Sequence, residues 1–289
     1  MSDSLEFTGE RFTPECEREI WYEHYHRYAL ATHWCVNART LDAACGEGYG
    51  SAMLAQAAAS VEGVDISTQA IEHAREKYGQ LPGVGFQVAN CTRLPFEDQE
   101  FDRVVSFETL EHLAEQDELL AEFKRVLKPD GCLILSSPDK ATYSDGQESV
   151  NEYHVRELYR DELEALIKRH FPAHCLLGQK LMFHSAIWSL DGFERVALDQ
   201  VSEGKNTTPR SFTQAPMYYI SLCAEDEASF PDPGDSLWLF DDHDESVYRH
   251  YDGEIRRHIA AGGILAGLEK EIAELKARSE IPAEPKHPW

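Results

Sequence analysis

Strand-like and helix-like segments alternate along residues 40–138, and this alternation constrains the fold more than any other feature of the sequence. Apolar runs typical of buried strands lie at 40–44, 60–66, 84–90, 101–107 and 131–137, and helix-like segments follow most of them. Such alternation forms a parallel sheet through right-handed crossovers. Several runs are apolar almost throughout, as burial on both faces requires. We therefore predict an α/β, Rossmann-like domain with flanking helices.

Two later segments extend this pattern toward a complete domain. Strand candidates near 174–181 and at 216–224 would bring the mostly parallel sheet to seven strands, and the segment between them is an expected insertion. The predicted α/β domain then occupies residues 40–224. Residues 1–39 precede it and carry aromatic side chains at helical spacing, including Trp21 and Tyr28, which predicts a helical lid.

The C-terminal part differs in composition from the rest of the chain. Residues 225–245 hold nine acidic residues and no Lys or Arg, which predicts a solvated acidic linker. From 246 to 289 the pattern predicts a C-terminal helix. Its apolar residues alternate at steps of three and four, which leaves self-association as a homodimer open; they are Leu265, Leu268, Ile272 and Leu275.

Charge and cysteine content limit the partners and the compartment. The net charge of −25 would repel a phosphate backbone, so we expect no long nucleic acid partner. Seven scattered cysteines without a Cys-x-x-Cys pair fit reduced thiols better than disulfides or zinc. No segment approaches the apolar length of a membrane span. We expect a cytoplasmic protein.

The segment LDAACGEGYG, residues 41–50, joins the first predicted strand to the first helix. Its glycines allow positive φ angles and close approach of a ligand, and a helix N-terminus offers unpaired N–H groups. Nicotinamide and flavin enzymes have a similar loop. A pyrophosphate would be repelled by Asp42 and Glu47, whereas Asp42 could help anchor the ammonium group of a sulfonium amino acid. The loop therefore favours a methyl donor over a dinucleotide.

Two residues further along the chain fit the same cofactor. Asp65 ends the second predicted strand, where a carboxylate can accept hydrogen bonds from both ribose hydroxyls. Asn90 follows the third strand and could meet the adenine edge with its amide. Taken alone, an acid at a strand end or an Asn in a turn is common. Their combination with the glycine loop supports S-adenosylmethionine.

The ordered segments LDAACGEGYG, VEGVDIS, FQVANCTRLPF, FDRVVSFETLEHL and RVLKPDGCLILSSP resemble the motifs of class I S-adenosylmethionine-dependent methyltransferases over residues 40–138. The resemblance implies that Gly46 and Gly48 line the methionine moiety and that Asp65 holds the ribose. It places Asn90 and Cys91 beside the adenine. The other cofactor-binding residues expected from it are Tyr28, Asp42, Ala44, Ile66 and Phe107. Ala44 and Asn90 depart from the commoner Gly and Asp.

A second group of residues is a candidate for the acceptor chemistry. In ETLEH, a helical first turn would place Glu108, Glu111 and His112 on one face. The motif resembles the Glu-x-x-Glu-His of small-RNA terminal ribose methyltransferases, in which a downstream histidine completes a metal site. His154 is its counterpart here. Such ligands suit Mn²⁺ or Fe²⁺ and tolerate Mg²⁺, and the metal could activate a hydroxyl of a vicinal diol.

Other interpretations of these residues stay open. His112 or His154 could act as a general base without metal, with Glu108 beside them, or the group could be structural. The segments GERFTPE, EHYHRYALA and NEYHVRELYRDEL resemble bacterial methyltransferases associated with cell-surface polysaccharide. The leading hypothesis is therefore O-methylation of a saccharide hydroxyl. The alternatives are methylation of a phenol, quinone or other small metabolite, a scaffold built on the C-terminal helix, and a nicotinamide oxidoreductase.

Overall fold

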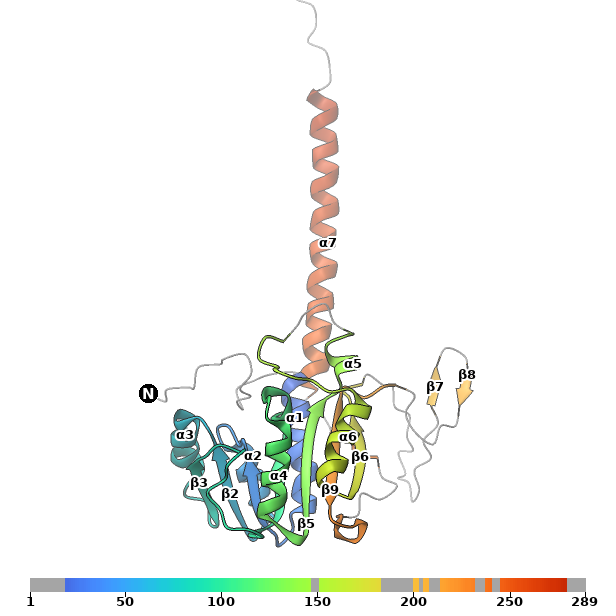
Figure 1. Ribbon diagram of the computed structural model, residues 1–289. Helices are drawn as coiled ribbons and strands as arrows, with labels where there is room; N and C mark the ends of the chain where they lie inside the picture. The colour runs from blue at the N-terminus through green and yellow to red at the C-terminus, as the bar shows by residue number, and fades with distance from the viewer. Residues whose placement is uncertain are drawn as a thin grey trace, which may run out of the picture. The chain divides into compact units, whose positions relative to one another are not determined.

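The computed structural model describes residues 19–146, 151–182, 200–202, 205–207, 214–231, 237–240 and 245–279. The chain divides into two compact units, Met1–Phe240 and Asp241–Trp289. The first unit holds the predicted sheet and lid, and the second holds the C-terminal helix (Figure 1). Among the described residues, no helix has the length and apolar character needed to cross a bilayer.

A seven-stranded sheet forms the centre of the first unit, as predicted. Its order is β3-β2-β1-β4-β5-β9-β6, and only β9 runs antiparallel to its neighbours within this sheet. The strands are β1 Arg39–Ala43, β2 Ser60–Asp65, β3 Val84–Val88, β4 Phe101–Ser106, β5 Leu127–Pro138, β6 Ala173–Gln179 and β9 Tyr218–Ala224. In the predicted insertion, β7 Gln200–Ser202 pairs with β8 Lys205–Thr207; most of that insertion lies outside the described residues.

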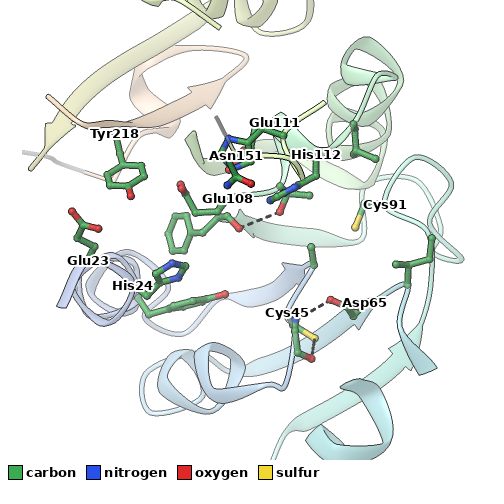
Figure 2. Close-up of a pocket in the computed structure, with 18 of the residues that line it drawn as sticks. Glu23, His24, Cys45, Asp65, Cys91, Glu108, Glu111, His112, Asn151 and Tyr218 are labelled. Carbon is green, nitrogen blue, oxygen red and sulfur yellow. Dashed lines mark hydrogen bonds between the residues drawn. The ribbon is translucent and has the colours of Figure 1, made fainter. Parts of the chain in front are cut away.

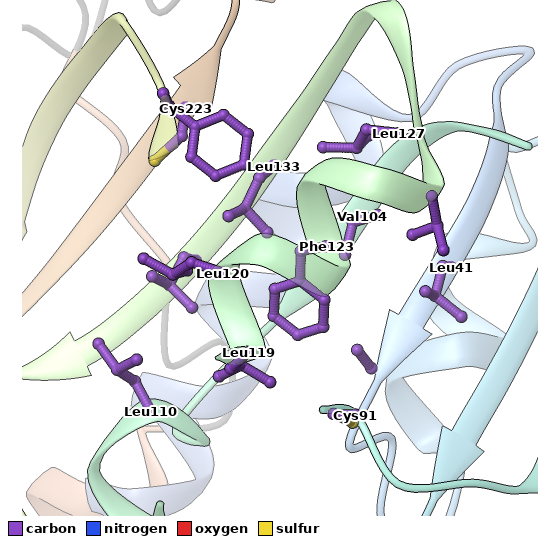
Figure 3. Packing of buried hydrophobic residues seen from close by; sticks show 14 of the residues in the cluster. Leu41, Cys91, Val104, Leu110, Leu119, Leu120, Phe123, Leu127, Leu133 and Cys223 are labelled. Atoms are coloured by element: carbon purple, nitrogen blue, oxygen red, sulfur yellow. The ribbon is translucent and has the colours of Figure 1, made fainter. Parts of the chain in front are cut away.

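Helices lie on both faces of this sheet (Figure 1). The helices of the first unit are α1 Glu19–Trp34, α2 Tyr49–Leu54, α3 Thr68–Tyr78, α4 Gln116–Val126, α5 Lys140–Tyr143 and α6 Arg160–His170, with 3₁₀ turns η1 Leu110–His112 and η2 Glu227–Ser229. The apolar side chains of α4, including Leu119, Leu120 and Phe123, pack on Leu41 and Leu133 of the sheet (Figure 3). A separate cluster covers the opposite face, so the central strands are buried on both sides, which explains their continuous apolar sequence.

The strand order reverses between β1 and β4, because the chain passes from β1 to β2 and β3 and then returns to the other side of β1. Loops after these strands diverge and leave a crevice at their carboxyl ends, where ligands bind in open α/β sheets. The cofactor loop after β1 and the ETLEH segment after β4 both start at this edge. The topology therefore brings together two segments that are about sixty residues apart.

The predicted acidic linker is partly packed in the structure. Two of its aromatic rings lie against rings of α1. The ring centroid of Phe240 is 5.7 Å from that of His26 and 6.0 Å from that of Tyr22, and the ring centroid of Trp238 is 5.2 Å from that of His33. These contacts hold residues 237–240 against α1. The first unit thus extends to Phe240, beyond the predicted domain end at 224.

The second unit contains one long helix, α7 Ser246–Ser279. It continues through Gly262 and Gly263, and residues 256–276 are exposed within the chain. The described cysteines are free thiols, as predicted; Cys16 lies outside the described residues.

Candidate active site

One cavity of about 450 Å³ opens at the carboxyl ends of the central strands (Figure 2). Seven predicted cofactor residues other than Tyr28 line it: Ala44, Gly46, Asp65, Ile66, Asn90, Cys91 and Phe107. The predicted acceptor-side residues line it as well: Glu108, Glu111, His112 and His154. Tyr28 of α1 completes the wall near the loop. The cavity is therefore continuous from the glycine loop to the histidines.

The glycine loop after β1 has an unusual backbone. Ala44, Gly46 and Gly48 have φ angles of 62°, 55° and 88°, in the left-handed region. For Ala44 this conformation costs about 1 kcal/mol, and the commoner glycine would avoid that cost. A Cβ on Gly46 would meet no protein atom within 4 Å, so it would project into open space. This open space beside the loop leaves room for a ligand to approach the backbone.

Gly48 is not among the described residues that line the cavity, and its contact with the methionine moiety stays a prediction. A Cβ there would lie 2.8 Å from both Ala74 Cβ of α3 and Phe86 Cε1 of β3. Gly48 therefore allows α2 to start in close contact with these elements. It shapes the loop through packing rather than through contact with the cavity.

Asp42 is fully buried and is not among the described residues that line the cavity. Its Oδ1 accepts a hydrogen bond from Tyr28 Oη at 3.0 Å, and its Oδ2 accepts one from Ser51 Oγ at 2.6 Å. Burial raises the pKa of Asp42 to about 6, although these two hydrogen bonds oppose the rise. Asp42 thus connects α1 to the first turn of α2, and its help in anchoring an ammonium group stays a prediction.

Asp65 connects the glycine loop to the end of β2. Its Oδ2 accepts a hydrogen bond from Gly46 N at 3.0 Å, and its Oδ1 accepts one from Ser67 N at 2.8 Å. A carboxylate has about four lone-pair sites, so these two bonds leave acceptor capacity for ribose hydroxyls. Asn90 Oδ1 accepts from Thr92 N at 2.9 Å, which places its amide at a turn on the cavity rim.

Glu108 is not part of the group of possible metal ligands that the structure brings together. It has a φ angle of 49° and lies outside the 3₁₀ turn, so the predicted helical face of Glu108, Glu111 and His112 does not form. Its Oε1 lies 2.8 Å from Nη1 of Arg27 and accepts a hydrogen bond from Ser136 Oγ at 2.6 Å. Arg27 is buried in α1. A partner for this buried cation is energetically important, because a buried charge without one costs several kcal/mol.

Glu111, His112 and His154 do come together, as predicted. Each offers a ligand atom, and the three atoms lie within 4.8 Å of one another. Glu111 is 1% exposed, and both of its carboxylate oxygens are buried without a hydrogen-bond partner. Burial, followed by the charge of Glu108, raises the pKa of Glu111 well above its ordinary value. Such an unsatisfied carboxyl beside two imidazoles is the arrangement expected for a cation ligand.

The hydrogen bonds of the two histidines set their tautomers. Nδ1 of His112 lies 3.1 Å from the carbonyl oxygen of Tyr153, and Nδ1 of His154 lies 2.5 Å from Glu157 Oε1. Both partners accept hydrogen bonds, so Nδ1 is the donor in each ring. A histidine oriented in this way by a carbonyl or carboxylate is typical of metal sites.

Several site residues were not found from the sequence. Glu23, His24, Tyr143, Asn151 and Tyr218 also line the cavity. Their sequence positions are spread over 195 residues, from α1 to β9, and no local motif connects them. The aromatic rhythm of α1 was the one available signal, because it predicted that this helix covers the site.

Comparison with known proteins gives the family. A model of the methyltransferase domain family matches residues 41–135. A probable S-adenosylmethionine-dependent methyltransferase of Mycolicibacterium smegmatis is 35% identical over 190 residues, which cover 64% of this chain and 72% of that protein. A similarly named protein of Mycobacterium tuberculosis is 37% identical over 166 residues, covering 56% of this chain and 60% of its own.

The fold agrees with a solved structure. The PH0226 protein of Pyrococcus horikoshii superimposes with a TM-score of 0.53 at 22% identity, over 73% of this chain and 93% of that one. The sheet order, the glycine loop and the Mycolicibacterium relative lead to one conclusion. This chain belongs to the S-adenosylmethionine-dependent methyltransferases.

Proposed function

We propose that this methyltransferase transfers the methyl group to a hydroxyl of a sugar or saccharide, assisted by a divalent metal ion at Glu111, His112 and His154. The observation that carries the metal is the buried carboxyl of Glu111, whose two oxygens have no partner although two histidine ligand atoms lie close by. The cofactor part rests on the family and on the open space beside Gly46.

The donor set favours a particular class of metal. With Glu108 paired to Arg27, two imidazoles and one carboxylate remain as protein ligands. This set suits Mn²⁺ or Fe²⁺, whereas Mg²⁺ prefers oxygen ligands alone. Three protein ligands also leave coordination positions for two neighbouring hydroxyls of a diol. When bound, the ion would lower the pKa of such a hydroxyl.

The reaction is an in-line displacement at the methyl carbon. The acceptor oxygen forms a bond to this carbon while the carbon–sulfur bond breaks, so S-adenosylhomocysteine leaves and the hydroxyl proton passes to water. The protein's task is alignment and proton removal. Asp65 and Gly46 would hold the donor at one end of the cavity, with Ile66, Asn90 and Cys91 around the adenosine. Glu111, His112 and His154 would hold, at the other end, the ion to which the acceptor hydroxyl binds.

The lining of the acceptor half supports a sugar. Glu23, Glu108 and Asn151 provide carboxylate and amide groups that can hydrogen-bond to hydroxyls. Tyr143 and Tyr218 add two aromatic rings with centroids 5.9 Å apart. Rings combined with planar polar side chains can bind both the C–H faces and the hydroxyl edges of a sugar. This combination fits a polyhydroxylated acceptor.

One observation favours the alternative, metal-independent methylation of a phenol, quinone or other small metabolite. The ring of Tyr143 stacks on that of His154, with centroids 5.2 Å apart and planes 27° apart. A flat aromatic acceptor could bind along these rings, and His112 or His154 would then accept the proton as a general base. In that case Glu111 would have no ligand role.

An acceptor screen separates the two proposals. Methyl glycosides with a vicinal diol are compared with their deoxy counterparts, and catechol is compared with phenol, using labelled S-adenosylmethionine. The sugar proposal predicts labelling of the diol glycosides and loss of labelling in the deoxy compounds. Labelling of catechol and phenol alike, without any glycoside, would replace it with the metabolite alternative.

Self-association through α7 is a further part of this proposal. Within the chain, its seam of Leu265, Leu268, Ile272 and Leu275 is between 50% and 59% exposed. These four residues occupy positions a and d of two heptads. In a parallel pair, Glu271 and Lys276 fall on opposing g and e positions, where opposite charges attract. A second copy of this helix would cover the seam.

A further inference from the structure

We infer that Gln116, which is neither a proposed metal ligand nor one of the residues that line the cavity, is the positioning residue that holds the two halves of the proposed metal site together. This inference rests on the proposed function, because it concerns how the ligands Glu111, His112 and His154 are brought into register. Gln116 is the first residue of α4 and is 1% exposed.

The ligands come from two separate segments. Glu111 and His112 lie in η1, whereas His154 lies in residues 151–158, which form no helix or strand of their own. An irregular segment can place a ligand accurately only if other contacts fix it. The geometry of the site therefore depends on the bonds between these two segments.

Gln116 makes the side-chain part of that connection. Its Nε2 donates one hydrogen bond to the carbonyl oxygen of Leu110 and another to that of Arg156, each of 2.9 Å. Next to it, the backbone N–H groups of Val155 and Arg156 donate to the carbonyl oxygen of Glu111 at 2.8 and 3.0 Å. One amide group thus links the residue before Glu111 to the residue two positions after His154.

Few side chains could replace this amide. Two carbonyl oxygens converge on Nε2, so the group must donate two hydrogens in fixed directions, which an NH₂ group does and a carboxylate cannot. The reversed amide orientation would place Oε1 against the same two carbonyls. In the observed orientation Oε1 is buried without a partner, so Gln116 leaves one polar atom unsatisfied to make these two bonds.

Support of this kind normally contributes strongly to metal affinity. Loss of a group that orients metal ligands typically weakens binding by about 10- to 100-fold. Gln116 also lies outside the cofactor-lining residues, so its loss should leave that half of the cavity intact. The inference thus predicts a selective effect on the metal.

The test measures Mn²⁺ and S-adenosylhomocysteine binding by calorimetry on the full chain. Gln116→Met keeps the size of the side chain and removes both bonds, and Gln56→Met makes the same exchange at an exposed position. We expect Gln116→Met to weaken Mn²⁺ binding by at least about tenfold, with S-adenosylhomocysteine affinity unchanged. Gln56→Met should change neither affinity. Amide hydrogen exchange at Val155 and Arg156 should accelerate in Gln116→Met alone.

If Gln116→Met binds Mn²⁺ as tightly as the wild type does, the inference is overturned. If His154→Ala does not bind Mn²⁺ in the same experiment, the proposed metal site still stands. Absence of Mn²⁺ binding to the wild type would reject the metal part of the proposed function and this inference with it. If Gln116→Met also loses S-adenosylhomocysteine binding, a second variant decides whether the effect on the metal is selective. This variant is Gln116→Asn, which keeps the amide on a side chain that is one methylene shorter. A selective loss of Mn²⁺ affinity in that variant supports the inference, and a parallel loss of both affinities overturns it.

Discussion

Tyr28 Oη donates a 3.0 Å hydrogen bond to Asp42 Oδ1, which joins the lid helix α1 to the end of β1 beneath the glycine loop. The Tyr28 ring also fills the position next to Gly50, where a Cβ would lie 2.1 Å from its Cζ atom. The lid is therefore fixed to the first turn of α2 by both polar and apolar contacts.

The buried carboxyl of Asp42 predicts a pH-dependent contribution to stability. Burial raises its pKa from 3.8 to about 6, so the folded state binds this proton more tightly than the unfolded state does. The resulting stabilisation is full below about pH 4 and is lost as pH rises through about 6, a change of about 3 kcal/mol. Asp42→Asn removes this titration. Urea unfolding should show the variant gaining stability relative to the wild type between about pH 4 and about pH 6; a pH-independent difference would contradict the assignment.

The loop glycines should respond differently to alanine. Gly50→Ala would push against the Tyr28 ring and is expected to cost about 1–3 kcal/mol in the free energy of unfolding. Gly46→Ala meets no protein atom within 4 Å, so it costs about 1 kcal/mol for its φ of 55°. It should nevertheless weaken S-adenosylhomocysteine binding, because the methyl group enters the cavity. Unfolding and calorimetry measure the two effects; unchanged affinity in Gly46→Ala would place the cofactor elsewhere.

Glu108 and Glu111 should differ in metal binding. Glu111→Gln removes the anionic ligand and is expected to lower Mn²⁺ affinity by at least about tenfold. Glu108→Gln is expected to leave Mn²⁺ affinity within about threefold, since its carboxylate pairs with Arg27. The same variant should reduce thermal stability, because the fully buried Arg27 loses its charge partner. A large loss of Mn²⁺ affinity in Glu108→Gln would restore it to the ligand set.

The seam of α7 predicts concentration-dependent dimerisation. Replacing Leu268 and Leu275 together by Asp places two charges at d positions of the seam and should give a monomer in sedimentation equilibrium. Ala273→Asp adds a charge outside the seam and serves as the matched control, which should remain dimeric. A wild-type chain that is monomeric at all concentrations would reject self-association through this helix.

The sequence predicted the sheet and cofactor loop well because their signals are local. Buried parallel strands have apolar runs, and Gly46 and Asp65 stand at fixed places relative to β1 and β2. The structure confirms the seven strands and brings seven of the expected cofactor residues besides Tyr28 to one cavity. Whether they bind the cofactor as proposed stays a prediction.

Residues whose role depends on distant partners could not be placed in this way. By spacing Glu108 is equivalent to Glu111, yet its carboxylate pairs with Arg27, eighty-one residues earlier, and Glu111 alone of the two groups with His112 and His154. Gln116 carries no motif, because its bonds go to backbone carbonyls in two segments. Asp42 stands at the predicted strand end, but burial by Tyr28 and Ser51 removes it from the cavity.

Metal dependence of methyl transfer tests the central claim most directly. Labelled methyl transfer to the diol glycosides is measured on protein treated with a chelator, before and after addition of Mn²⁺, with Glu111→Gln as a parallel sample. We expect chelation to lower turnover by at least about tenfold, Mn²⁺ to restore it, and Glu111→Gln not to respond. Equal turnover before and after chelation would contradict a metal-assisted mechanism at Glu111, His112 and His154.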